Sequence, residues 1–339
     1  MLLTPLPFQV LVNLAQAGGA RRPGLRLAAE ALLVLAPGLV VVVGIADGLA
    51  GLGVGGGRGA AAGFGLALTG ALAGAAATPA VAGRLARWMP IQPDNLVHRL
   101  ALELTVGLVA FQLLTQLTTD VLAEAASAPP LTPLDLVTME VPFLLAALAG
   151  VGLWIRRSPA QVAARLGAVV PQPGQLLLAL AAAGVFYGFG VGADALAQWL
   201  TPGLTQRVNT ATGHIFSGLG DPLGIATIAL AAGICEELFF RGALQPRLGL
   251  LWTAVVFASV HTQYGLSLSA LAVLVLAFGL GLLRRYTNTT TSAVCHVTYN
   301  ALVGVGIGGL GLPVFVGVEA ALIAAVLLTT WVGKRPAGA

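Results

Sequence analysis

The chain has 339 residues, of which 57% are hydrophobic and only 9% are charged, and its mean hydropathy is +0.91. Soluble domains carry about 25% charged residues, so this composition excludes a soluble globular protein, a disordered chain and a solvated coiled coil. The 17 Lys and Arg exceed the 13 Asp and Glu only slightly and are scattered between apolar runs, so no nucleic-acid partner is expected.

A membrane-spanning helix needs about 20 largely apolar residues. Taken in chain order, such segments follow a short N-terminal stretch that we expect at the membrane interface. They predict an all-α, polytopic transmembrane helical bundle of about ten spans, with eight as the lower estimate. The segments lie near 27–47, 60–82, 98–119, 134–155, 174–199, 222–247, 249–264, 267–283, 287–309 and 312–332. The longest loops are expected at 120–133 and 200–221.

Basic residues test this assignment, because Lys and Arg are enriched in cytoplasmic loops. Almost all of them fall at alternate ends of the predicted spans, from Arg21, Arg22 and Arg26 through Arg84, Arg87, Arg99, Arg156, Arg157, Arg165, Arg247, Arg284 and Arg285 to Lys334 and Arg335. Only Arg58 and Arg207 fall at the other ends. The pattern predicts a multi-pass integral membrane protein with both termini in the cytoplasm.

Polar residues inside three of the later spans are the main functional signal, because a charge near the bilayer centre costs about 2.5–3.5 kcal/mol. These residues are Glu236, Glu237 and Arg241, then Phe257 and His261, then His296 and Asn300. Helical residues four apart share a face. Glu237 can therefore pair with Arg241 and His296 can act beside Asn300, while Glu236 points elsewhere.

The depth of these groups agrees between segments. Counting residues from the nearest cytoplasmic arginine places Glu236, His261 and His296 about 16–21 Å into the membrane, if the spans are helical throughout. This agreement favours one polar site over scattered polar residues.

At these residues the sequence resembles the CAAX protease and bacteriocin-processing family, also called the ABI family, which includes the type II CAAX prenyl endopeptidases. The family pattern is a double Glu followed by Arg, then Phe-x-x-x-His, then His-x-x-x-Asn. All three motifs occur here in that order. The resemblance implies that residues 201–335 form an intramembrane protease domain, and that residues 1–200 are N-terminal transmembrane helices without a motif.

The resemblance also implies roles for the motif residues. Glu236 with His261 would activate a water molecule to attack a peptide carbonyl, and His296 with Asn300 would form the oxyanion hole. Glu237, Arg241 and Phe257 would support these four. General chemistry agrees, because burial makes a carboxylate a stronger base and donors aimed at an oxyanion are worth about 2.7–4 kcal/mol each.

A metal-dependent mechanism remains open, because two His and a carboxylate can hold Zn²⁺. Its ligands would be Glu236, His261 and His296. The helical zinc motif H-E-x-x-H is absent, so we favour a glutamate-type protease without a cofactor.

Two other functions use the same residues differently. A transporter or ion relay would use the polar layer to move protons or ions, and a scaffold would only bind partners. The ordered motifs favour an endopeptidase that acts on membrane-anchored or membrane-proximal proteins or peptides at the lipid bilayer. The sequence does not distinguish CAAX-type from other peptide substrates.

Overall fold

The computed structural model describes residues 5–53, 56–306 and 311–332, and in this part of the chain the fold is all-α, as predicted. The α-helices are α1 (Leu6–Gly18), α2 (Pro23–Gly53), α3 (Gly56–Ala77), α4 (Pro79–Leu85), α5 (Leu96–Thr118), α6 (Val121–Ser127), α7 (Pro133–Val151), α8 (Pro159–Leu166), α9 (Pro173–Leu200), α10 (Pro202–Ile215), α11 (Pro222–Glu236), α12 (Gln245–Ser259), α13 (Leu268–Tyr286), α14 (Thr289–Val305) and α15 (Leu312–Val332). Four shorter elements are η1 (Gly19–Arg21), η2 (Phe216–Leu219), η3 (Glu237–Leu244) and η4 (Thr262–Tyr264).

Seven of the described helical segments are long and apolar enough to cross a membrane. The predicted span 222–247 and the first part of the predicted span 249–264 form one such segment, Pro222–Ser259, which is bent at Gly249, where φ is 80°. Residues 260–264 lie beyond its end. The last two predicted spans are also helical, but α14 has only 17 residues and α15 carries a shorter apolar stretch, Leu312–Leu328. Residues 307–309 of the ninth predicted span lie outside the described residues.

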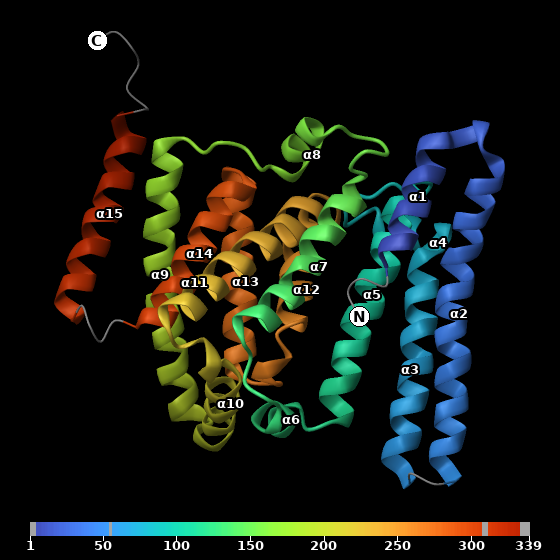
Figure 1. Ribbon diagram of the computed structural model, residues 1–339, viewed down its shortest axis with the longest axis horizontal. Helices are drawn as coiled ribbons and strands as arrows, with labels where there is room; N and C mark the ends of the chain where they lie inside the picture. The colour runs from blue at the N-terminus through green and yellow to red at the C-terminus, as the bar shows by residue number, and fades with distance from the viewer. Residues whose placement is uncertain (1–4, 54–55, 307–310, 333–339) are drawn as a thin grey trace.

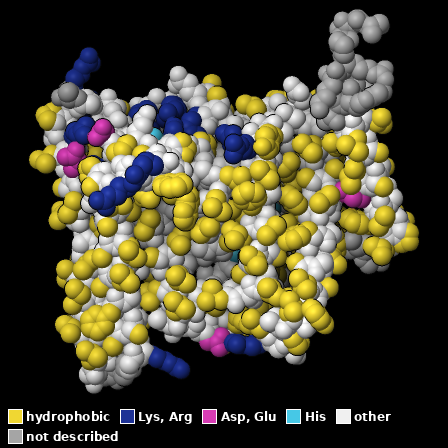
Figure 2. All heavy atoms as spheres, turned by 180° about the vertical axis from the view of Figure 1, so that it is seen from behind, with side chains coloured by type: hydrophobic (Ala, Val, Ile, Leu, Met, Phe, Trp, Pro, Cys, Tyr) yellow, Lys and Arg dark blue, Asp and Glu magenta, His cyan; other side chains and the backbone are white. Residues whose placement is uncertain are grey.

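Helices α1 to α5 lie at one side of the molecule, and α9 and α15 lie at the other (Figure 1). Helices α7, α11, α12, α13 and α14 lie between them. Most basic side chains gather along one edge of the molecule, with hydrophobic side chains below them (Figure 2). We call this edge the arginine-rich end; it is the upper end in Figure 1.

Glycines bring α2 and α3 into backbone contact. A Cβ atom added at Gly63 would lie 2.2 Å from the backbone nitrogen of Gly48, and one added at Gly44 would lie 2.2 Å from that of Ala67. Small residues permit this close approach of membrane helices.

We therefore expect Gly63→Val to separate α2 from α3 and to destabilise the protein by about 1–3 kcal/mol, the usual effect of overpacking. Thermal unfolding of the purified protein in detergent measures this effect. Gly38→Val is the matched control, because no atom lies within 4 Å of a Cβ added at that position of α2. Equal destabilisation by the two variants would contradict the glycine contact.

The stretches 120–133 and 200–221, expected to be loops, contain the helices α6 and α10. The Asp120 side chain caps α6 by accepting a hydrogen bond from the Ala123 N–H. That bond and the Arg207 guanidinium, 2.6 Å away, hold the pKa of Asp120 below its usual value. Side-chain capping and the contacts between α6 and α10 stabilise these two helices. Hydropathy along the sequence detects neither effect, so the helices were not predicted.

Candidate active site

The first motif lies where the helix changes its winding. Helix α11 ends at Glu236, and Glu237–Leu244 forms the π-helix η3. The spacing of Glu237 and Arg241 predicts regular α-helix here, and the π-helix differs from that prediction. Segments of π-helix are rare and occur frequently at functional sites. Arginines bind backbone carbonyls near the end of this helix: Arg165 Nη1 donates to the Gly242 oxygen at 2.9 Å, and Arg284 Nε donates to the Arg241 oxygen at 3.2 Å.

Glu237 is the fully buried anchor of the site. Its Oε1 lies 3.2 Å from Arg241 Nη1 in an ion pair, which is the pairing predicted from the spacing. The same oxygen accepts a hydrogen bond from His296 Nδ1 at 3.1 Å, and Oε2 accepts one from Ser292 Oγ at 2.6 Å. Three groups from η3 and α14 therefore hold this carboxylate in one position.

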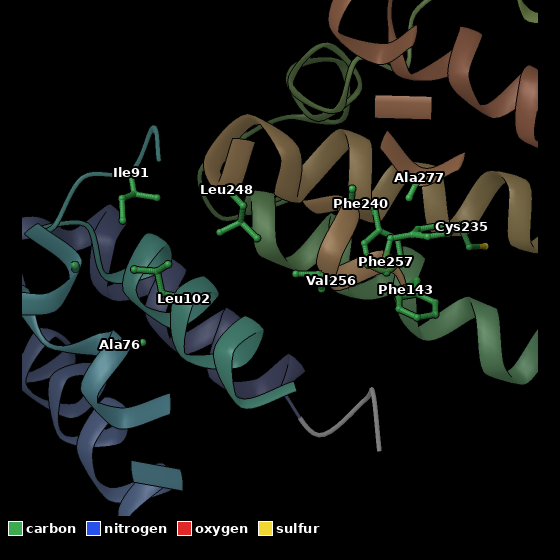
Figure 3. Packing of buried hydrophobic residues seen from close by; sticks show 12 residues of the cluster. Ala76, Ile91, Leu102, Phe143, Cys235, Phe240, Leu248, Val256, Phe257 and Ala277 are labelled. Carbon is green, nitrogen blue, oxygen red and sulfur yellow. The ribbon is translucent and has the colours of Figure 1, made fainter. Parts of the chain in front are cut away.

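Arg241 is also fully buried, and it continues the network toward α13 and α12. Its Nη2 donates to the Ala277 carbonyl at 3.2 Å, and its guanidinium carbon lies 4.3 Å from the centre of the Phe257 ring. Phe257 packs edge-to-face on Phe240 with ring centres 5.0 Å apart. Figure 3 shows these two rings beside Phe143 and Ala277. The second motif thus packs directly on the first.

Glu236 does not share the hydrogen bonds and the ion pair of Glu237. Its side chain is buried, and its Oε2 has no hydrogen-bond partner among the described residues. This oxygen lies 3.9 Å from Nε2 of His296. That distance is longer than a hydrogen bond. His296 thus stands between the two carboxylates, hydrogen-bonded to Glu237 and separated from Glu236.

His261 follows the end of α12, and its backbone has left the helix. Its Nδ1 lies 2.8 Å from the Phe257 carbonyl oxygen, and its ring stacks on Phe257 with centres 4.6 Å apart. A carbonyl only accepts hydrogen bonds, so Nδ1 carries the proton. In the neutral ring Nε2 is then free to accept one.

The structure brings most, but not all, of the predicted site residues into contact. Glu236, Glu237, Arg241, Phe257, His261 and His296 are linked through the contacts above. Glu236 itself makes no hydrogen bond or ion pair with His261 in the described part of the chain. Asn300 lies one turn after His296 on α14, is partly buried, and makes no side-chain hydrogen bond to the described residues.

Three further residues of the site were not found from the sequence. Ser292 precedes His296 by four residues on α14, and this spacing was the available signal. Tyr264 lies nearly parallel to the His261 ring, with centres 6.4 Å apart. Glu140 on α7 is buried, has an Oε2 without a hydrogen-bond partner, and acts electrostatically on Glu236. Nothing in the sequence connects α7 to the motifs.

Comparison with known proteins gives one match. Residues 218–302 match the family described as type II CAAX prenyl endopeptidase Rce1-like. The matched segment contains all three motifs but less than half of the chain. It confirms the predicted resemblance to the CAAX protease family and, at family level, supports a CAAX-type protease, which is a hydrolase. No curated protein and no solved structure matches the chain.

Proposed function

We propose that the protein is an intramembrane endopeptidase in which Glu236 activates water to hydrolyse a peptide bond of a membrane-anchored or membrane-proximal substrate. The observation that carries this proposal is the buried Glu236 carboxylate, whose unpartnered Oε2 faces Nε2 of His296 across 3.9 Å. A buried carboxylate suits general acid–base chemistry when it lies beside an imidazole whose other ring nitrogen is held by a hydrogen bond.

The hydrogen bonds on the two histidines support a different role for each. His261 uses Nδ1 toward Phe257, so its neutral ring offers Nε2 as an acceptor. Water bound between Glu236 and His261 would point both of its protons at acceptors and keep a lone pair for attack. His296 uses Nδ1 toward the Glu237 carboxylate, and in the doubly protonated ring that we propose for it Nε2 is also a donor, toward the site. Asn300 on the next turn supplies a second donor.

The reaction then proceeds in two steps. The water oxygen bonds to the carbonyl carbon while its proton passes to Glu236, and the carbonyl oxygen becomes an oxyanion held by His296 and Asn300. Collapse of this intermediate breaks the C–N bond, and Glu236 returns the proton to the leaving nitrogen. The products are one carboxylic acid and one amine, as hydrolysis requires. Glu237, Arg241 and Phe257 position the groups and do not react.

Zinc does not fit the donor set well. Among the residues that the structure describes, no three His, Cys, Asp or Glu side chains converge as metal ligands do. The proposed mechanism therefore uses no metal ion.

Activity should survive removal of metal if this assignment is right. We expect the purified protein to keep its hydrolytic rate after dialysis against a chelator. A rate that is lost on chelation and restored by Zn²⁺ would contradict the metal-independent mechanism and favour the zinc form of the same protease.

We also propose that substrates approach from the arginine-rich end, which would face the cytoplasm together with both termini. The basic edge in Figure 2 supports this orientation through the positive-inside rule. Labelling of an Ala258→Cys variant in sealed vesicles tests it. We expect a membrane-impermeant reagent to react only from the cytoplasmic face, and reaction only from the outer face would reverse the orientation.

The experiment that tests the function compares new protein N-termini in membranes of cells that express wild type or Glu236→Gln. We expect cleavage products that occur with wild type only, and their sequences identify the substrate. Glu319→Gln is the matched control, since Glu319 also has a carboxylate oxygen without a hydrogen-bond partner among the described residues but lies on α15, facing Gly184 of α9. Identical profiles at equal protein levels would favour the transport alternative.

A further inference from the structure

A cavity lies apart from the motif residues of the candidate active site. It has a volume of about 660 Å³ and is bordered by α1, α2, α3 and α5 on one side and by α7, η3 and α12 on the other. None of Glu236, His261 and His296 lines it. Pockets for small ligands typically measure about 300–1,000 Å³. Figure 3 shows the two sides of this boundary, with Leu102 on α5 and Val256 on α12.

The cavity is strongly amphipathic. Most of its wall is apolar and comes from membrane-spanning helices, for example Leu32 and Val40 of α2 and Leu104 and Leu108 of α5. One end is lined by four arginines from the α7–α8 connection, α8 and α12, namely Arg156, Arg157, Arg165 and Arg247. The acid in its wall, Glu103, is next to the charge of Arg99.

The four arginines have no carboxylate partner. None of them forms an ion pair with an acid in the described ranges. Arg157 and Arg165 donate to backbone carbonyls, whereas the buried Nε of Arg156 has no hydrogen-bond partner among the residues that the structure describes. Burial, followed by the nearby charge of Arg247, lowers the pKa of Arg165 to about 10. Positive charge is therefore concentrated at this end, and no acid in the described part of the chain forms an ion pair with it.

The position of the cavity indicates the chemical class of its ligand. Its arginine end lies at the arginine-rich end of the bundle, where we expect lipid headgroups because Lys and Arg concentrate at membrane surfaces, and its apolar part extends along the long apolar helices. Guanidinium groups bind phosphate oxygens through strong, charge-assisted hydrogen bonds. We propose that this cavity binds an anionic phospholipid, with the phosphate on Arg156 and Arg247 and an acyl chain in the apolar part. The proposal does not depend on the hydrolytic function.

The test uses the full-length protein in nanodiscs that contain equal amounts of phosphatidylglycerol and phosphatidylcholine with identical acyl chains. Native mass spectrometry of the released protein counts the lipids that stay bound. We expect phosphatidylglycerol to be enriched on wild type. The double variant Arg156→Gln/Arg247→Gln should lower this enrichment about tenfold, the change expected when charge-assisted contacts are lost.

Two variants separate this site from lipid on the outer surface. Arg58→Gln removes one positive charge from an exposed position outside the cavity and should leave the enrichment unchanged. Ala101→Trp places a large side chain in the cavity wall and should remove the bound lipid without changing the four arginines. Equal binding of the two lipids to wild type would overturn the proposal, as would the same loss in Arg58→Gln as in the double variant.

Discussion

Glu236→Gln is expected to lower kcat by about 10²–10⁴-fold on the substrate identified in cells, because the amide cannot take the proton of the attacking water. Gln nearly matches Glu in shape, and Glu236 Oε2 has no hydrogen-bond partner to lose. KM and thermal stability should therefore change little. Steady-state kinetics and thermal unfolding of the purified protein measure both quantities.

Two comparisons make this result specific. Glu319→Gln should retain the wild-type rate. Glu237→Gln should reduce both rate and stability, since Glu237 contacts Arg241, Ser292 and His296. A Glu236→Gln protein that keeps most of the wild-type kcat would remove this residue as the base.

The largest loss of stability is expected from Arg241→Met. The substitution leaves the fully buried Glu237 carboxylate without its cation, and breaking such a pair from one side costs about 3–5 kcal/mol. It also removes the Arg241 contacts to the Ala277 carbonyl and the Phe257 ring. Thermal unfolding in detergent should show this as a large decrease in Tm.

The double variant Glu237→Gln/Arg241→Met distinguishes an uncompensated charge from lost packing. We expect it to be more stable than Arg241→Met alone, because no buried charge remains unpaired. Arg207→Met is the exposed comparison and should change Tm little, since its partner Asp120 is exposed. A double variant less stable than the single one would show that packing, and not charge, is the main effect.

Much of the fold was predictable because long apolar segments have few alternatives in a membrane. Their helices begin and end close to the predicted residues; α5, predicted at 98–119, is Leu96–Thr118, and α9, predicted at 174–199, is Pro173–Leu200. The bend at Gly249 was anticipated only as a boundary between two spans. The polar helices α6 and α10 were missed, because capping and mutual contact form them.

For the candidate site, the spacing of charged residues within apolar segments was sufficient to select the motif residues. It predicted the Glu237–Arg241 pair, which the structure contains. It could not predict that His296 lies between the two carboxylates, because this depends on how α14 packs against η3. Glu140 could not be placed either, since its relation to Glu236 exists only in three dimensions. The catalytic roles themselves stay predictions.

The π-helix η3 restricts where the chain tolerates insertions and deletions of single residues. A π-helical turn holds one residue more than an α-helical turn, so it is equivalent to a single-residue insertion in an α-helix. Deleting one residue between Glu237 and Leu244 would remove the extra residue and let the segment wind as a regular α-helix, which changes the faces on which its remaining side chains lie. The fully buried Glu237–Arg241 ion pair would then lose its present geometry. Insertions and deletions in this short segment should thus be tolerated far less than those at the ends of α6 or α10.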